Sequence, residues 1–321
     1  PITSQEFDEE HRSVATLLRE QGALTEKARA SVPRTERLRD LKLVIVSICA
    51  YPADNPLPRL SNSVHRLYTS RHGYDYLGHS ETLSGDRPPA WGKVRAMHDA
   101  LEDGRWDWAL WVDCDLFFMD LGTTIDSLML RYGSKSNSEL AQEGSFSLSD
   151  LDPGFHMLLS EDSQMLNTAF FLMRRSGWSL DLLRRVWGPE DSPFVDHTWW
   201  EQAAFAQELL GGNHRRFAGV EYGPEGLFGL AAGSASHPYP REVRLVPQYE
   251  VNSYHPISSR LVGETWAPGK FVLSFNGAQS LSGPTVARLL HANYYEIFCR
   301  LNSVEEMCET LSDDRFAPWL A

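Results

Sequence analysis

Two aspartates one residue apart, Asp113 and Asp115, are the residues of this chain whose type and spacing best suit metal chemistry. They follow Trp108–Val112, an apolar run typical of a strand buried on both faces. If the chain leaves that strand in extended form, both carboxylates point the same way. Carboxylates so close repel each other unless a cation lies between them, and oxygen ligands suit Mg²⁺ or Mn²⁺.

The pair therefore predicts a metal site that would hold a diphosphate and neutralise it as it departs. An Asp-x-Asp sequence is common, and a turn with two solvated acids after an ordinary strand is the alternative.

The elements that must position this pair alternate between strands and helices. Strands are predicted at Leu43–Val46, Tyr74–Leu77, Trp108–Val112, Phe155–Leu159, Ala169–Met173, Val243–Val246 and Phe271–Phe275. Helices are predicted at Ser61–His72, Trp91–Leu101, Trp178–Val186, Thr198–Leu210 and Pro284–Arg300. The alternation indicates an α/β fold whose sheet has parallel members. Ligand crevices of open α/β sheets form at strand ends, which is where the two aspartates lie.

The chain divides into three parts by character. Residues 1–40 are polar with apolar positions at helical spacing, which predicts a helical arm or stem. Residues 41–300 form one α/β domain, and residues 301–321 are expected to pack on it as a tail. At 321 residues the chain is long enough to bury a large core without disulfides or metals.

Composition excludes some classes of protein. Hydrophobic residues at 42% and charged residues at 23% are globular values, so the chain is not largely disordered. The net charge of −13 argues against nucleic acid or an anionic membrane face as the main partner. No apolar run approaches the roughly 18–20 residues that span a bilayer. Because the chain begins at Pro1, a signal or anchor could have been removed.

The four cysteines are too few for a disulfide scaffold and lack zinc spacing. A Cys299–Cys308 bridge and two free thiols in the core are both open.

Several segments, in order along the chain, resemble the motifs of one family. They are Arg71-His72-Gly73-Tyr74-Asp75, Pro89-Ala90-Trp91-Gly92-Lys93, Trp108–Asp115, Ser160-Glu161-Asp162, Leu166–Leu172, Ser176–Ser179 with Leu182-Leu183, Trp200–Ala204, Asn252-Ser253-Tyr254 and Pro268–Val272. The sequence is similar in these segments to glycosyltransferase family 34, which includes fungal α-1,2-galactosyl- and α-1,6-mannosyltransferases and plant xyloglucan xylosyltransferases. The resemblance spans about residues 41–277.

The resemblance implies a GT-A fold, a single Rossmann-like domain with a mixed, mainly parallel sheet. It also implies a nucleotide-sugar donor, Mn²⁺ or Mg²⁺, and sugar transfer with retention of anomeric configuration. By the same resemblance Asp113 and Asp115 would hold the metal. The residues expected to bind the donor are Ser47, Ile48, Cys49, Lys93, Asp113, Gly277 and Gln279, and those expected around the sugar and the acceptor hydroxyl are Asn167, Glu201 and Gln202.

Each of these roles has a simpler alternative. Lys93 opens a helix, where a cation is unfavourable, and this favours a ligand role over a solvated lysine. Asn167 could satisfy a turn, and Glu201 with Gln202 could form an exposed helix face. Three tryptophans could form a stacking platform for sugar rings or simply be buried, and these are Trp91, Trp199 and Trp200.

One segment departs from the family pattern. Where the family has His-Phe-x-Gly-Cys-Lys, this chain has Ser274-Phe275-Asn276-Gly277-Ala278-Gln279. A hydroxyl replaces the metal-binding imidazole, and an amide replaces the ammonium near the diphosphate. Three consequences are open. Water or another residue, such as Asn276 or His291, fills the ligand position; the protein binds metal weakly; or it has lost transferase activity.

The sequence therefore predicts a retaining, metal-dependent glycosyltransferase, an enzyme with a UDP-sugar as the favoured donor, GDP-mannose as the other donor and a glycan acceptor. The alternative is a weakened relative that acts as a carbohydrate-binding or scaffold protein. A phosphatase of the haloacid-dehalogenase type fits poorly, because two strands precede the Asp-x-Asp pair. By resemblance the compartment is the Golgi lumen, with the cytoplasm as the alternative, and a homodimer is possible.

Overall fold

The structure is a computed structural model that describes residues 35–135, 146–162, 165–211, 239–256, 265–278 and 283–304. Its centre is a six-stranded sheet in the order β3-β2-β4-β8-β7-β9. The strands are β2 (Leu43–Ile48), β3 (Asp75–His79), β4 (Trp108–Val112), β7 (Met157–Glu161), β8 (Leu166–Arg174) and β9 (Val243–Val246). Strand β2 runs parallel to β3 and β4, and β7 runs parallel to β9, whereas β8 is antiparallel to both β4 and β7. The mixed, mainly parallel sheet confirms the predicted α/β class and its GT-A arrangement.

The apolar character of the central strands follows from their burial on both faces. Along β2, Leu43 and Ile45 pack into the core on one side of the sheet, and Val44 and Val46 pack into the core on the other. Because side chains alternate across a strand, a strand with helices on both faces has no polar face. This is why an unbroken apolar run predicted β2 and β4 correctly.

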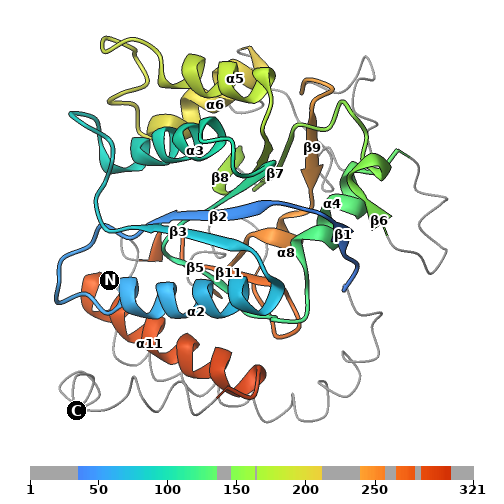
Figure 1. The fold of residues 1–321 in the computed structure, drawn as a ribbon. Coiled ribbons are helices and arrows are strands. Elements are labelled where there is room, and N and C mark those ends of the chain that lie inside the picture. The colour runs from blue at the N-terminus through green and yellow to red at the C-terminus, as the bar shows by residue number, and fades with distance from the viewer. Residues whose placement is uncertain are drawn as a thin grey trace.

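Helices cover both faces of this sheet (Figure 1). Helices α3 (Gly92–Glu102), α5 (Gly177–Trp187) and α6 (Trp200–Leu210) lie on one face, and α2 (Leu57–His72) and α11 (Pro284–Leu301) lie side by side on the other. Ser176 begins α5 by accepting a hydrogen bond from the backbone N–H of Ser179, as an N-cap does. Gly73, with φ of 70°, ends α2 in the left-handed conformation that favours glycine.

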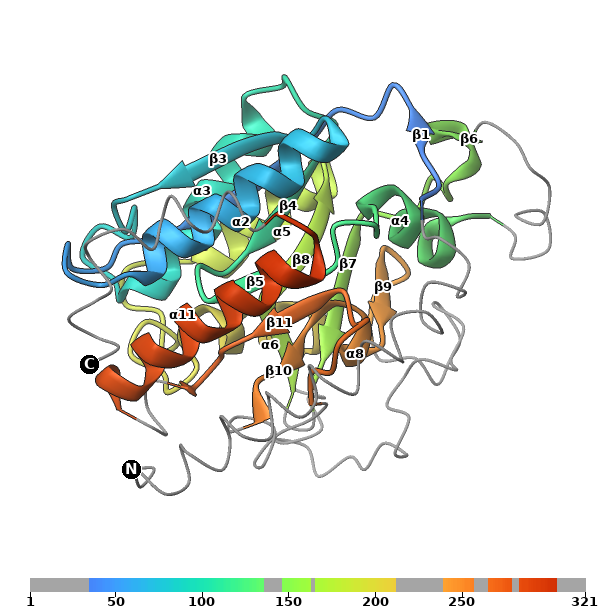
Figure 2. The same cartoon turned by 90° about the horizontal axis from the view of Figure 1, so that it is seen from below.

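Smaller elements complete the face that carries α2 and α11 (Figure 2). Strands β5 (Leu116–Phe118), β10 (Ser253–Tyr254) and β11 (Val272–Ser274) form a second sheet in the order β10-β11-β5. Helices α4 (Ile125–Gly133) and α8 (Gln248–Val251) and the pair β1 (Leu38–Arg39) and β6 (Phe146–Ser147) lie beyond it. Short 3₁₀ turns span Pro89–Trp91 and Leu148–Asp150. The turn between β4 and β5, which holds Asp113 and Asp115, therefore joins the two sheets.

All the predicted strands and helices are present, most with ends shifted by one to four residues. The short elements β1, β5, β6, β10, α4 and α8 were not predicted. The prediction of a helical arm over residues 1–40 is wrong at its end, because Leu38 and Arg39 pair with β6 as a strand. Residues 1–34 of that arm, and the tail beyond Val304, lie outside the described residues.

Candidate active site

The aspartate pair lies at the carboxyl end of β4, between strands β2 and β8. The backbone N–H of Asp113 donates to the carbonyl of Ala169 on β8 at 2.9 Å. The carbonyl of Asp115 accepts from the N–H of Phe275, just beyond β11, also at 2.9 Å. Trp111, the penultimate residue of β4, donates its Nε1–H to Oδ1 of Asp113 at 2.7 Å. The site therefore takes its shape from the central strands, as strand-end sites of α/β sheets do.

Lys93 contacts this pair from the first turn of α3. Its Nζ lies 3.0 Å from Oδ1 of Asp113 and 3.0 Å from Oε1 of Glu201. It also lies within hydrogen-bonding distance of the backbone and side-chain oxygens of Thr168. Lys93 is only 6% exposed, so it is not the solvated lysine of the simpler alternative. The prediction that Lys93 approaches the donor is not tested, but the structure places its ammonium beside Asp113.

Glu201 and Gln202, at the start of α6, meet the same network. The hydroxyl of Thr168 donates to Oε1 of Glu201 at 3.1 Å, and the backbone N–H of Thr168 donates to Oε1 of Gln202 at 3.2 Å. Glu201 is 3% exposed, whereas Gln202 is partly exposed. Glu201 is therefore not part of an exposed helix face, and Gln202 is the member of the two that solvent reaches.

Asn167 belongs to a neighbouring buried network. Its Nδ2 donates to Asp162 at 3.2 Å and to the hydroxyl of Tyr254 at 2.8 Å, while its Oδ1 accepts from the N–H of Ala169. Asn167 is buried, with 1% of its surface exposed. It lies on β8 next to Thr168, whose hydroxyl contacts both Glu201 and Lys93. Tyr254 extends this network to Asn276, whose Nδ2 lies 3.4 Å from the same hydroxyl.

The electrostatics of the cluster reflect several acids around one base. Burial raises the pKa of Asp115 to about 7, repulsion from Asp113 acts in the same direction, and Lys93 opposes both. Burial also raises the pKa of Glu201 despite its contact with Lys93. For Lys93 burial favours the neutral amine, but Asp113 and Glu201 outweigh it and raise the pKa. One ammonium therefore serves two carboxylates, and Asp115 has no cation of its own among its described contacts.

The donor set fits a divalent cation held partly by substrate. Among the described residues, no three His, Cys, Asp or Glu side chains come close enough to hold a metal ion alone. Two carboxylates completed by diphosphate oxygens and water are a usual set for Mg²⁺. Ser274, where the family has its histidine, is fully buried on β11 and its Oγ accepts from the N–H of Asn276. His291 packs edge-on against Phe275 in the core, and Asn276 is exposed.

The residues expected to line the nucleoside pocket lie at the end of β2. Ser47 is fully buried and Ile48 is partly exposed. Cys49 forms a disulfide with Cys114, the residue between the two aspartates, and the pairing was not predicted from the sequence. Among the residues that the structure describes, no cysteine is free, so the expectation of two free thiols in the core is wrong. Cys299 is also disulfide-bonded, while Cys308 lies outside the described residues.

The remaining candidates are divided between surface and interior. Gly277 is exposed in the turn after β11, with φ of 76°, and Gln279 lies outside the described residues. Of the three tryptophans, Trp91 is fully buried, Trp199 packs partly against the core and Trp200 is 43% exposed. A stacking platform formed by all three is therefore wrong, because burial accounts for Trp91, and Trp200 is the member that a sugar ring could reach.

Three residues of this site escaped the sequence analysis. Thr168 and Trp111 are ordinary strand residues, and only their contacts with Gln202 and Asp113 give them a role. Tyr51 is 37% exposed, and burial of its hydroxyl together with the charges of Asp115 and Asp113 raises its pKa. Tyr51 is thus close enough to the aspartate pair for both charges to act on its hydroxyl. An aromatic residue only two positions after Cys49, the last of the predicted nucleoside-binding residues, was the signal that could have found it.

An α/β sheet with an Asp-x-Asp turn at the end of a central strand, and a buried Lys–Glu pair beside it, is the arrangement expected from the resemblance to GT-A glycosyltransferases. A sequence profile of the galactosyl transferase GMA12/MNN10 family matches residues 49–216, which is half of the chain. The chain belongs to this family. The match includes the Asp-x-Asp turn, Lys93, Asn167 and the start of α6.

Two solved structures are similar to the chain at low identity. One is a glycosyltransferase involved in the glycosylation of the major capsid of PBCV-1, with 14% identity, a TM-score of 0.46 and coverage of 78% of this chain and 98% of that one. The other is A197 from STIV, with 10% identity, a TM-score of 0.25 and coverage of 51% and 76%. TM-scores below 0.5 carry no information about the reaction. No curated protein matches the chain.

Proposed function

We propose that this glycosyltransferase is metal-dependent, takes its sugar from a UDP-sugar and transfers it to a hydroxyl of a glycan with retention of configuration. The observation that carries the proposal is the contact of Lys93 with Asp113 at 3.0 Å beside a second carboxylate, Asp115. The cluster of Asp113, Asp115, Glu201 and Lys93 has three acids and one base. A divalent cation bound at the two aspartates would balance this excess of negative charge.

The residues of the chain divide the work of such a site. Asp113 and Asp115 would hold Mn²⁺ or Mg²⁺, which supplies a charge that stabilises the departing diphosphate when bound. Trp111 orients Asp113 by a hydrogen bond to Oδ1, and Lys93 on α3 contacts the same oxygen. Because Lys93 also contacts Glu201, it links Asp113 to α6, the helix that carries Gln202. The amide of Gln202 is partly exposed, and in this proposal it is the group that would meet the sugar or the acceptor hydroxyl.

The burial of Glu201 supports a displacement in which the acceptor hydroxyl attacks the anomeric carbon from the same face as the departing diphosphate. A nucleophilic carboxylate must reach the anomeric carbon, but Glu201 is 3% exposed and its Oε1 contacts both Lys93 and Thr168. We therefore assign Glu201 and the still more buried Asn167 to positioning, and no covalent glycosyl-enzyme is proposed.

The donor class and the compartment rest on the family. Its description as galactosyl transferase favours a UDP-sugar, with GDP-mannose as the competing donor. A Golgi lumen is consistent with the Cys49–Cys114 disulfide, because disulfides persist in oxidising compartments and are rare in the cytosol. Among the described residues, no helix combines the length and apolar character that a membrane span requires.

A second candidate function is a carbohydrate-binding relative that no longer transfers sugar. The observation that favours it is Ser274, which is buried and hydrogen-bonded where the family places a metal-binding imidazole. Such a protein would bind glycans and would not respond to nucleotides.

A thermal-shift titration separates the two functions. UDP and GDP are each added with and without Mn²⁺ to the wild type, to Asp113→Asn/Asp115→Asn, and to Asp181→Asn, an exposed aspartate on α5 that serves as the matched control. A ligand at 100 times its dissociation constant adds about 2.7 kcal/mol of stability. We expect Mn²⁺-dependent stabilisation by UDP in the wild type and the control, but not in the double variant. Stabilisation by GDP instead would change the donor, and no response to either nucleotide would favour the carbohydrate-binding protein.

A further inference from the structure

The residue between the two aspartates is tied covalently to the neighbouring strand. Strands β2 and β4 are parallel, with Val46 opposite Trp111, so opposite residues are 65 positions apart in the sequence. Cys49 and Cys114 are also separated by 65 positions, and their Cα atoms are 5.1 Å apart. The disulfide therefore continues the register of the two strands beyond their last pairing, into the turn that carries Asp113 and Asp115.

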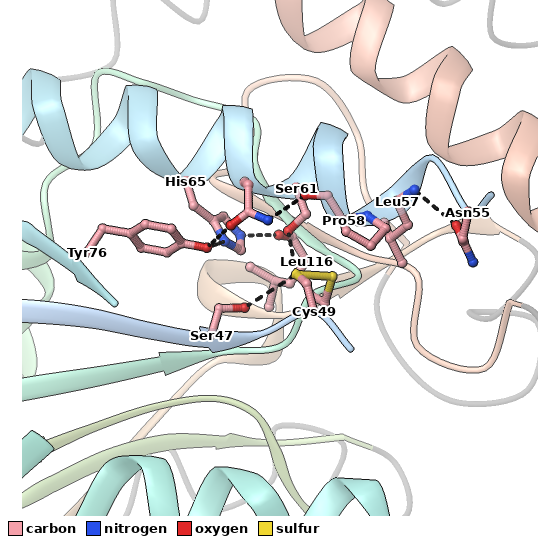
Figure 3. Close-up of a disulfide and its surroundings, with 11 residues drawn as sticks. Ser47, Cys49, Asn55, Leu57, Pro58, Ser61, His65, Tyr76 and Leu116 are labelled. Carbon is pink, nitrogen blue, oxygen red and sulfur yellow. Dashed lines mark hydrogen bonds between the residues drawn. A yellow bond between two sulfur atoms is a disulfide. The ribbon is translucent and has the colours of Figure 1, made fainter. Parts of the chain in front are cut away.

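Both sulfur atoms are enclosed by polar and apolar side chains of the core. Cys49 is 5% exposed and Cys114 is 4% exposed. The hydroxyls of Ser47 and Ser61 lie 4.0 Å and 3.7 Å from Sγ of Cys49, and because a disulfide sulfur carries no proton, the hydroxyls are the donors (Figure 3). The disulfide thus links the end of β2 to the turn after β4, and the hydrogen bond from Ser61 connects both to α2.

The other supports of this turn are hydrogen bonds and one ion pair. The side chain of Asp113 contacts Trp111 and Lys93, and the remaining supports hold the backbone of the turn. Asp113 is bonded to β8, Asp115 to the chain after β11, and the carbonyl of Leu116 contacts Nε2 of His65 on α2 at 2.7 Å. These contacts hold the residues on either side of Cys114. The disulfide holds Cys114 itself. It ties this residue to Cys49, directly after β2, and none of the supports just named involves that segment.

The position of the bond matters because the two carboxylates repel each other. Without a fixed backbone between them, Asp113 and Asp115 would relax apart, and a cation would then have to draw them together at a cost in affinity. Ligands that are already held in place avoid that cost, and groups that orient metal ligands without touching the metal typically change metal affinity by about 10- to 100-fold when removed.

We propose that the Cys49–Cys114 disulfide is a positioning element of the metal site, which holds the two aspartates at the spacing that a divalent cation requires. The inference rests on the proposed metal dependence of the enzyme. Cys49 and Cys114 do not touch the metal or the substrate in this proposal, and they act through Asp113 and Asp115.

The test measures Mn²⁺ binding directly, by the loss of the electron paramagnetic resonance signal of free Mn²⁺ in the presence of UDP. The variant is Cys49→Ser/Cys114→Ser, and the matched control is Cys299→Ser, which removes the other disulfide. We expect the dissociation constant for Mn²⁺ to rise at least tenfold in the double variant and to stay within twofold of the wild type in the control. Circular dichroism melting checks that both proteins remain folded.

Reduction of the wild type gives a second measurement on an unchanged sequence. A water-soluble phosphine donates two electrons to the disulfide and takes oxygen from water, whose two protons go to the two thiols. We expect the reduced protein to bind Mn²⁺ as weakly as the double variant, and reoxidation to restore the affinity.

The outcomes separate this inference from the proposed function. If the oxidised wild type does not bind Mn²⁺, the proposed metal dependence fails. Equal Mn²⁺ affinity in the wild type and the double variant overturns the positioning role alone. Unfolding of both the double variant and the reduced protein would also overturn it, since the bond would then hold the fold rather than the turn.

Discussion

The ammonium group of Lys93 lies 3.0 Å from Oε1 of Glu201, and both side chains are almost fully buried. The same ammonium lies 3.0 Å from Oδ1 of Asp113. One lysine at the start of α3 thus joins the Asp-x-Asp turn after β4 to the start of α6. Because Lys93 and Glu201 are removed from water, the loss of either one is costly for the other.

Replacing Lys93 by Met should therefore destabilise the protein strongly. The variant leaves Glu201 as a buried carboxylate without its cation, and breaking a buried pair in this way costs about 3–5 kcal/mol. Glu201→Gln should cost less, because Lys93 keeps its contact with Asp113. Urea unfolding at pH 7.5 measures both effects. Arg95→Met, at an exposed position of the same helix, is the control and should stay within about 0.5 kcal/mol of the wild type. A loss below 1 kcal/mol for Lys93→Met would contradict the buried network.

Gly92 is required by a close approach of two backbone segments. A Cβ atom at this position would lie 1.6 Å from the carbonyl oxygen of Thr82, which the backbone cannot accommodate without moving. Gly92→Ala should cost about 1–3 kcal/mol or more and should weaken nucleotide binding, because the first turn of α3 carries Lys93.

Gly177→Ala is the matched control for this substitution. It also lies at the first position of a helix, α5, and nothing lies within 4 Å of its added Cβ. This variant should be neutral or stabilised by up to about 1 kcal/mol. Thermal melting of both proteins tests the pair, and equal melting temperatures would show that the Thr82 loop moves aside freely.

His65 should make the protein sensitive to acid. It is fully buried on α2, and burial lowers its pKa to about 4, although the contact with the carbonyl of Leu116 opposes this shift. The unfolded chain then binds more protons than the folded one between about pH 6.5 and 4, so the stability present above pH 6.5 is lost as the pH falls through this range.

His65→Gln removes one titrating group from this window. The free energy of unfolding, measured between pH 7.5 and 4.5, should fall less steeply with decreasing pH in the variant. The difference in slope is at most that due to the uptake of one proton on unfolding. His291, whose burial lowers its pKa to about 3, contributes in the same direction and remains in both proteins. An unchanged slope in His65→Gln would rule out His65 as a source of acid sensitivity.

Trp200 should bind acceptor rather than stabilise the fold. It is 43% exposed, and its φ of 38° is a strained conformation for a bulky residue, which proteins retain mainly at functional sites. Trp200→Gly relieves this strain, so its melting temperature should not fall. If a sugar ring stacks on the indole, the KM for the acceptor should rise about tenfold, equivalent to about 1.4 kcal/mol, with little change in kcat. Tyr249→Ala, at an equally exposed aromatic on α8, is the control. Equal acceptor KM values in the two variants would exclude the stacking role.

The sequence alone determined the sheet and the position of the aspartate pair. Apolar runs predicted β2 and β4 because strands buried on both faces lack polar residues. The i, i+2 spacing of Asp113 and Asp115 after such a run is a local signal, so it could be recognised without knowing what lies beside it. The short strands β5 and β10 have too few residues to show a period, and their pairing with β11 defines them.

Tertiary structure decided which distant residues meet at this pair. Lys93, Thr168 and Glu201 come from three separate elements, and only the packing of α3 and α6 around the end of β8 shows that one ammonium serves two carboxylates. Cysteine pairing is likewise not readable from a list of positions, because several connectivities are always possible. The parallel register of β2 and β4 places Cys49 opposite Cys114, and strand register is a property of the folded sheet.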